Sequence, residues 1–466
     1  MEILQNFISL LHEFILKING VVWGPPMLLL LMGTHLFLTF RLKFIQKYVF
    51  KAIKLSVTKD DSGSGDISQF GALTTALAAT IGTGNIVGVA TAIALGGPGA
   101  VFWTWMTGVF GIATKYSEGL LAVKYRVKTS DGTMLGGPMY ALERGLKMKW
   151  LGVLFSVFTV IASFGIGNMA QANSITDMLN KSFNIPQLYS GIVITIATAV
   201  VVLGGVKVIA KVCEGLVPFM AGFYIIGCIY ILILNFNFIP QAIVLMLTSA
   251  FTAKDATGGF IGSTLMLAMR YGVARGLFSN ESGLGSAPIA AAAAQTKNPV
   301  RQALVSMTGV FWDTIVVCML TGLVLITSII KYPSNLGGLK GAELTSKAFS
   351  EIPHVGTFIL TIGLFTFAFS TILGWSYYGE KAFESLFGKK LSHYYRFFFV
   401  CIVLVGSVTA NAFVWDISDT FNAMMAIPNL ISLLLLSPVI YSETKKYLWE
   451  NRLDEKDETE IPQIND

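Results

Sequence analysis

Residues 80–88 read Thr-Ile-Gly-Thr-Gly-Asn-Ile-Val-Gly and lie in the middle of a long apolar run that extends from about residue 68 to residue 95. The three glycines remove side chains and allow backbone angles that other residues avoid, so they predict a break in the helix of this run. Within a membrane, a broken helix is tolerated only where protein or a water-filled cavity receives the freed backbone groups. The stretch therefore predicts an interrupted transmembrane helix at a binding site.

The composition around this stretch favours a membrane protein. Of the 466 residues, 54% are hydrophobic and only 13% are charged, whereas soluble domains carry about 25% charged residues. The four cysteines lie in apolar runs without metal-ligand spacing, and the four histidines are scattered. No HExxH, GxSxG or Walker A motif lies within the spans, so a membrane-embedded enzyme is disfavoured.

Apolar runs predict an all-α polytopic membrane protein with about eleven transmembrane helices. They fall near residues 20–40, 68–95, 97–123, 151–180, 188–206, 209–235, 258–290, 300–330, 355–386, 394–411 and 414–441. The count suggests one extra helix followed by two groups of five with opposite topology. Each group opens with a glycine-interrupted helix, at residues 81–88 and 276–285. Interrupted helices at matching positions of two halves indicate a transporter's binding site.

The predicted domain boundaries follow from these spans. Residues 1–19 are expected to form an amphipathic segment on the membrane surface, and residues 20–447 a single transmembrane transport domain. Within it, residues 20–40 are the extra helix, 68–235 the first repeat and 258–441 the second. The polar tail, residues 448–466, is expected to be cytoplasmic and disordered. With the N-terminus outside, about four Lys or Arg residues fall in cytoplasmic segments for each one outside.

The first break predicts two adjacent binding functions. The helix that restarts after it begins with unpaired N–H groups and a positive dipole end, so we expect the amides of Thr83 and Gly84 to hold a substrate carboxylate. The carbonyls before the break are free to ligate a small cation, and Asn85 adds a side-chain oxygen or donates to the substrate. The alternative is that Gly84 and Gly88 serve close helix packing, as in small-xxx-small contacts.

The second break carries several polar residues within a nominal span. Backbone carbonyls around Phe278, with Ser279 and Asn280, are candidates to receive a substrate ammonium. Glu281 is expected either to pair with Arg275, to act in gating, or to contact the substrate directly, because ionisable groups within a membrane are functional candidates.

Other ionisable residues also lie within the spans. Asp313 is a further possible partner for the arginines that precede the break, Arg270 and Arg275. Lys115 and Glu118 lie three residues apart and favour an internal pair over a proton relay.

Two further spans supply candidates. Ser370 and Thr371, adjacent hydroxyls on an apolar helix, would complete an oxygen-only site that favours Na⁺, or they bond back to their own helix. Trp375, one turn later, could close the pocket over a small substrate, or it is a core residue. Gln171 is the candidate cavity residue of the fourth span, with interhelical hydrogen bonding as its alternative.

Long motifs in chain order resemble the alanine or glycine:cation symporter family, and they suggest an archaeal member. They are Gly-Thr-Gly-Asn-Ile-Val-Gly (82–88), Gly-Pro-Gly-Ala-Val-Phe-Trp-Thr-Trp (97–105), Gly-Gly-Pro-Met-Tyr (136–140) and Gly-Leu-Phe-Ser-Asn-Glu-Ser-Gly-Leu-Gly-Ser-Ala-Pro (276–288). The resemblance implies the inverted five-plus-five fold of the bacterial leucine transporter and Na⁺-coupled transport of alanine or glycine, with H⁺ in some members.

On that fold's pattern, residues 80–85 correspond to the unwound part of the first core helix. The resemblance then implies that the amides of Thr83 and Gly84 take the carboxylate. It also implies a Na⁺ site of two carbonyls and two hydroxyls, from Ala78, Ile81, Ser370 and Thr371. Asn85 matches a second sodium position of the leucine transporter.

The expected function is therefore Na⁺-coupled uptake of a small amino acid by alternating access, in a cell membrane, by a monomeric transport unit without a cofactor. An H⁺-coupled transporter of another small amino acid is the alternative. A channel is less favoured, because a continuous pore offers no reason for broken helices at matching positions.

Overall fold

A computed structural model describes residues 2–58, 63–252, 265–409 and 412–464. Six described helical segments are long and apolar enough to cross a membrane. Two further pairs of helices, each bent at a short break, are long and apolar enough when the two helices of a pair are taken as one span. The other predicted spans correspond to α6, α10 and α13. The all-α polytopic fold is confirmed, although the start of the span predicted at 258–290 and the end of the span at 394–411 lie outside the described residues.

The first half of the chain is helical apart from one small hairpin. Its elements are α1 (Glu2–Val22), α2 (Pro25–Arg41), η1 (Ile45–Tyr48), α3 (Val49–Ser56), α4 (Gln69–Thr80), η2 (Gly84–Gly88), α5 (Val89–Gly96), α6 (Gly99–Lys124), β1 (Val127–Lys128), β2 (Met134–Leu135), α7 (Pro138–Tyr140), η3 (Ala141–Gly145), α8 (Lys149–Phe164), η4 (Gly165–Met169), α9 (Ala170–Phe183), α10 (Gln187–Val202), α11 (Val206–Leu234), η5 (Phe236–Phe238) and α12 (Ile239–Ser249). Strands β1 and β2 pair antiparallel, with Val127 opposite Leu135.

The second half is helical throughout its described part. Its elements are α13 (Leu265–Asn280), α14 (Pro288–Ala292), α15 (Pro299–Val310), η6 (Phe311–Cys318), α16 (Met319–Lys331), α17 (Pro333–Leu336), α18 (Gly341–Phe349), α19 (Gly356–Phe387), η7 (Lys389–Leu391), α20 (Ser392–Val408), α21 (Ala412–Leu435), α22 (Ser437–Thr444) and η8 (Lys445–Trp449). Segments η2, η3, η4, η6 and η8 are π-helical turns.

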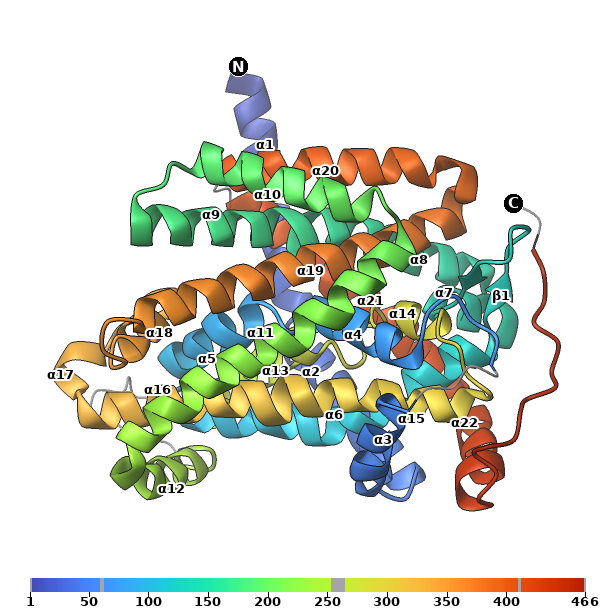
Figure 1. Ribbon diagram of the computed structural model, residues 1–466, viewed down its shortest axis with the longest axis horizontal. Helices are drawn as coiled ribbons and strands as arrows, with labels where there is room; N and C mark the ends of the chain where they lie inside the picture. The colour runs from blue at the N-terminus through green and yellow to red at the C-terminus, as the bar shows by residue number, and fades with distance from the viewer. Residues whose placement is uncertain (1, 59–62, 253–264, 410–411, 465–466) are drawn as a thin grey trace.

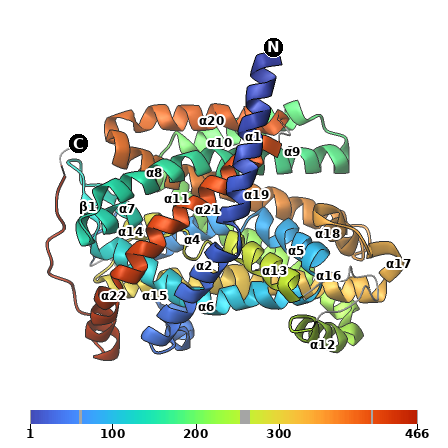
Figure 2. The same ribbon diagram turned by 180° about the vertical axis from the view of Figure 1, so that it is seen from behind.

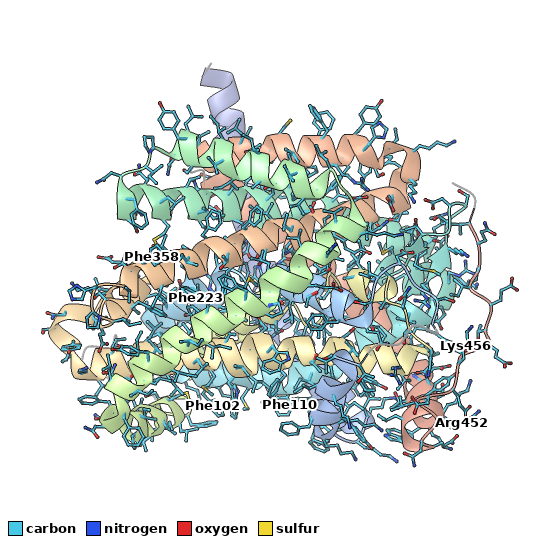
Figure 3. All side chains as sticks on the ribbon, viewed as in Figure 1. Phe102, Phe110, Phe223, Phe358, Arg452 and Lys456 are labelled. Carbon is cyan, nitrogen blue, oxygen red and sulfur yellow. The ribbon has the colours of Figure 1, made fainter. Side chains whose placement is uncertain are left out.

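The broken helices occupy the interior of the bundle. In Figure 1, α9, α10 and α20 form a layer along one edge, α6, α15 and α16 lie along the other, and α4, α5, α13 and α14 lie between them. Figure 2 shows α1, α2 and α21 crossing the opposite face. Phe102 and Phe110 lie along the lower edge of the bundle in Figure 3, and Arg452 and Lys456 lie near the C-terminal end.

The first broken helix begins and ends for local reasons. The Ser68 hydroxyl accepts a hydrogen bond from the Gly71 amide at 2.8 Å and caps the start of α4. At Ile81 the backbone becomes extended, with ψ 90°. The chain then restarts as η2 and α5 at an angle of 50° to α4. The interruption predicted at residues 80–88 is therefore present.

The second broken helix is unwound over a longer stretch. Helix α13 ends at Asn280 and α14 begins at Pro288. Between them Gly283 and Gly285 adopt left-handed φ angles of 91° and 86°, which side chains disfavour. Their amides donate to one oxygen of Glu118 at 3.0 and 3.1 Å. A buried carboxylate from α6 thus satisfies backbone donors that lipid cannot satisfy.

At one end of the bundle, the start of the first broken helix is hydrogen-bonded to the end of the second. The Gln295 amide donates to the Ile67 carbonyl at 2.8 Å, just before α4 and just after α14. The Arg126 guanidinium donates to the carbonyls of Ala292, Ala294 and Ser64 at 2.9 to 3.1 Å. Burial lowers the pKa of Arg126 to about 10, which leaves it charged at neutral pH.

The C-terminal segment lies across this junction. Asn298 donates to the carbonyls of Leu453 and Glu455, both at 2.9 Å. The Lys128 amide donates to the Pro462 carbonyl at 2.9 Å, and Arg301 contacts Asp454 at 2.9 Å. The prediction of a disordered tail is therefore wrong, because distant loops supply partners that tail composition does not reveal.

The N-terminal segment is a helix, as its apolar spacing predicts. Helix α1 continues to Val22, packs against α21, and its His12 ring lies 2.7 Å from the Asp416 carboxylate. Its position on the membrane surface stays a prediction.

Candidate functional site

A small cavity of about 20 Å³ lies where the two broken helices meet. It is lined by both breaks, by the π-helical turn η4 with the start of α9, and by α19 and α21. The lining residues are Ala79, Thr80, Gly82, Thr83, Gly84, Ile166, Gln171, Phe278, Glu281, Thr371, Trp375 and Asn422. Thr83, Gly84, Gln171, Phe278 and Trp375, each predicted from sequence as a substrate residue, thus line one cavity.

The amides after the first break are available to a ligand. Among the hydrogen bonds of the described residues, neither the Thr83 nor the Gly84 amide has an acceptor. The neighbouring Gly82 amide donates instead to the Asn85 side-chain oxygen at 2.8 Å. Two free donors at a helix start, facing a cavity, suit a carboxylate.

The predicted Na⁺ residues lie on the other side of the same break. The Ser370 hydroxyl donates to the Ala78 carbonyl at 3.1 Å, so α19 touches the end of α4 there. Ser370 and Thr371 each also donate to the Phe367 carbonyl at 2.9 Å, the alternative expected for hydroxyls on a helix. The structure brings the two hydroxyls to the break beside Ile81, which is fully buried.

Asn85 does not line the cavity but joins the break to η6. The side-chain nitrogen of Asn85 donates to the Asp313 carboxylate at 2.7 Å. The Ser279 hydroxyl lies 3.0 and 3.1 Å from the two oxygens of the same carboxylate, to which it donates. Asp313 therefore accepts hydrogen bonds from Asn85 and Ser279, and the possible pairing with Arg270 or Arg275 does not form. Sequence reasoning underrated it because no local pattern brings Asn85, Ser279 and Asp313 together.

The other candidate residues of the second break point in different directions. Glu281 faces the cavity and accepts from the Trp375 indole at 3.1 Å and from the Ser286 hydroxyl at 2.5 Å. The expected Glu281–Arg275 pair does not form. Asn280 points to the opposite side and donates to Thr107 at 3.3 Å. The cavity lining includes Phe278 but neither Ser279 nor Asn280.

Two amide side chains offer unused acceptors here. The Gln171 nitrogen donates to the Ile166 carbonyl at 3.1 Å, which leaves its side-chain oxygen buried without a partner. The Asn422 side-chain oxygen is likewise buried and unpartnered. Sequence reasoning missed Asn422, although an amide in an apolar span was the available signal.

The glycines of the first break differ in what surrounds them. A methyl group at Gly82 would lie 2.5 Å from the Thr371 hydroxyl oxygen, whereas one at Gly88 would meet nothing within 4 Å. The close-packing alternative considered above for Gly84 and Gly88 therefore fails at Gly88 but applies to Gly84, where a methyl group would lie 3.2 Å from the Phe278 ring and 3.6 Å from the Ser279 Cα. Gly82 is required at the break by the approach of α19.

Comparisons with known proteins agree on one family. The model of the sodium:alanine symporter family matches residues 8–461. The sodium/alanine symporter AgcS of Methanococcus maripaludis is 53% identical over 450 residues, covering 95% of this chain and 98% of that protein. The amino-acid carrier protein AlsT of Bacillus subtilis is 37% identical, covering 90% of this chain and 88% of that protein.

Solved structures share the fold at low sequence identity. MhsT in complex with L-phenylalanine superposes with a TM-score of 0.56 at 14% identity, covering 81% of this chain and 98% of that chain. A Na⁺-coupled sialic acid symporter in a substrate-bound outward-open state gives 0.51 at 13% identity, covering 92% and 86%.

We predict that Gly82→Ala weakens Na⁺ binding, whereas Gly88→Ala does not. The added methyl group in Gly82→Ala displaces the Thr371 hydroxyl, at a cost of roughly 1–3 kcal/mol typical of overpacking. The measurement is the Na⁺-dependent rise in melting temperature of the purified protein, with Gly88→Ala as the matched control. Equal Na⁺ responses in the two variants would contradict the assignment of Thr371 to the ion site.

Proposed function

Since this chain belongs to the sodium:alanine symporter family, we propose that it is a secondary active transporter that couples the uptake of alanine or glycine to Na⁺. The observation that carries this proposal is the cavity between the two broken helices, which the free amides of Thr83 and Gly84 and the hydroxyl-bearing Thr371 all line. The protein is a multi-pass membrane protein and not an enzyme.

The substrate carboxylate binds the amides of Thr83 and Gly84. Both line the cavity, both lack an acceptor within the described chain, and both stand at the positive end of the helix that restarts there. Phe278 and Trp375 supply the apolar walls.

One Na⁺ binds between the end of α4 and α19. Its ligands are the carbonyls of Ala78 and Ile81 and the hydroxyls of Ser370 and Thr371. Hard cations prefer oxygen ligands, and the Ser370 hydroxyl already lies 3.1 Å from the Ala78 carbonyl. On Na⁺ binding the hydroxyl protons turn away and the same oxygens face the ion.

A second cation binds beside Asp313. The Ser279 hydroxyl and the Asn85 side-chain nitrogen both donate to its carboxylate, and all three residues are fully buried or nearly so. A buried carboxylate with only neutral donors around it favours a cation or a proton. Na⁺ is the first candidate, and H⁺ here is the remaining alternative for the coupling ion.

Transport proceeds by alternating access. The cavity of about 20 Å³ has room for about one water molecule, so Trp375 or Phe278 must move before an amino acid enters. Coupling requires that Na⁺ favour the conformation that binds substrate. The site needs no cofactor, and a single chain contains both broken helices, so the monomer is the transport unit.

The membrane orientation follows from the charge distribution. We propose that the N-terminus is outside and that the end with Arg126 and the C-terminal segment is cytoplasmic, in a plasma membrane. The repeats comprise residues 68–235 and 258–441, preceded by residues 1–19 and the extra helix at 20–40, and followed by the tail at 448–466.

Uptake into proteoliposomes tests the function as a whole. We expect alanine or glycine to accumulate against its gradient only when an inward Na⁺ gradient is imposed. Non-saturating downhill flux without Na⁺ would instead support a channel, and accumulation driven by a proton gradient alone would support H⁺ coupling.

The double variant Ser370→Ala/Thr371→Ala tests the first ion site. Each lost contact to a cation costs about 1.5 kcal/mol or more, so Na⁺ activation should weaken by roughly 100-fold or more. Thr366→Ala is the matched control, because that hydroxyl lies on the same helix and donates only to its own carbonyls, Ile362 and Gly363. Unchanged Na⁺ activation of uptake in the double variant would remove both hydroxyls from the site.

A further inference from the structure

The cavity contains a carboxylate that forms no direct ion pair with a Lys, Arg or His within the described residues. Glu281 is only 3% exposed and lines the cavity. Within the described residues, no Lys, Arg or His nitrogen lies within the 4.0 Å limit of an ion pair with it. Buried charges in proteins are normally paired, since an unpaired charge loses its hydration without compensation.

The nearest basic residues do not pair with Glu281. The Lys115 nitrogen is buried without a hydrogen-bond partner, 4.0 Å from Glu118 and outside the cavity lining, and its single charge acts on Glu118, Glu281 and Asp313 together. The Arg275 guanidinium lies 5.9 Å from the centre of the Phe278 ring. The nearby carboxylate of Asp313 repels that of Glu281 and accepts hydrogen bonds from Asn85, Ser279 and Thr314. One lysine cannot balance three buried carboxylates, so the charge of Glu281 is left for a proton or a cationic ligand, and the cavity that Glu281 faces favours the ligand.

Glu281 is also held in place more firmly than a surface carboxylate. Trp375 donates to one of its oxygens and Ser286 to the other. Each oxygen keeps a second acceptor position free for a ligand. The residue has a φ of 54°, an uncommon conformation for a side chain with a Cβ and one that clusters at functional sites.

Two more acceptors line the same cavity. The side-chain oxygens of Gln171 and Asn422 are buried, unpartnered and belong to residues that are 3% and 2% exposed. An ammonium group has three N–H donors. One carboxylate from the second break and two amide oxygens from α9 and α21 match that number.

We infer that Glu281, Gln171 and Asn422 form the binding site for the α-ammonium group of the substrate. This inference rests on the proposed amino-acid transport and adds the recognition of the positive end. The carboxylate binds the Thr83 and Gly84 amides, the ammonium binds Glu281, and the small side chain faces Phe278 and Ile166. Trp375 is a positioning residue, because it acts through its bond to Glu281.

This arrangement defines a substrate class. Zwitterionic amino acids with a primary ammonium satisfy all three acceptors, whereas a short carboxylic acid such as propionate leaves a buried carboxylate unpaired and is rejected. An N-acetylated amino acid is rejected for the same reason.

Equilibrium binding to the purified full-length chain tests the inference. In saturating NaCl, we expect Glu281→Gln to weaken alanine binding by roughly 30-fold or more. The Na⁺-induced rise in melting temperature, measured without alanine, should stay as in the wild type. Glu214→Gln is the matched control, because Glu214 lies on α11 and accepts from Ser68, away from the cavity. Gln171→Leu repeats the test if Glu281→Gln is not monodisperse.

The outcomes separate the two proposals. Wild-type alanine binding in Glu281→Gln would overturn the inference, and wild-type binding together with loss of the pH dependence of uptake would make Glu281 a proton carrier instead. Failure of the proposed function is different, because the wild-type chain itself would then show no Na⁺-dependent alanine binding.

Discussion

The backbone of a broken helix needs hydrogen-bond partners that lipid cannot supply, and the interior of this protein is arranged around that need. At the first break the side chain of Asn85 accepts from the Gly82 amide and donates to Asp313. At the second break, Glu118 accepts from the amides of Gly283 and Gly285. The second stretch has two more side-chain partners, because Asn280 accepts from the Ser282 amide and Asn429 donates to the Gly283 carbonyl, both at 2.9 Å. The amides of Thr83 and Gly84 are left over and line the cavity.

Much of the fold was predictable because its signals are local. Apolar runs long enough to cross a membrane and glycines that interrupt them are visible within about 20 residues of sequence. The ends of α4 and α13 follow directly from them. The amides of Thr83 and Gly84 were predictable for the same reason, since a helix that restarts always begins with unpaired donors.

The rest of the site depends on which helix faces turn inward, which no local pattern fixes. Glu281 and Trp375 are separated by 94 residues in the chain, and Asn85 and Asp313 by 228. Two adjacent residues of α13, Ser279 and Asn280, point to different neighbours because successive helical residues are about 100° apart. Asn422 was missed because a single amide in an apolar span does not reveal whether its side chain faces a cavity or a neighbouring helix. The tail was misjudged because its partners are loops far away in sequence.

The junction formed by Arg126 has a kinetic consequence. Its guanidinium binds carbonyls beside both broken helices, so a movement that parts the start of α4 from the end of α14 must break its hydrogen bond to Ser64 or those to Ala292 and Ala294. While they break, a buried charge must regain water, and that rehydration adds to the barrier. The tail lies over the same loops through Asn298 and Lys128. The speed of a transport cycle can therefore be limited by a contact that lies outside the cavity and that a bound ligand does not touch.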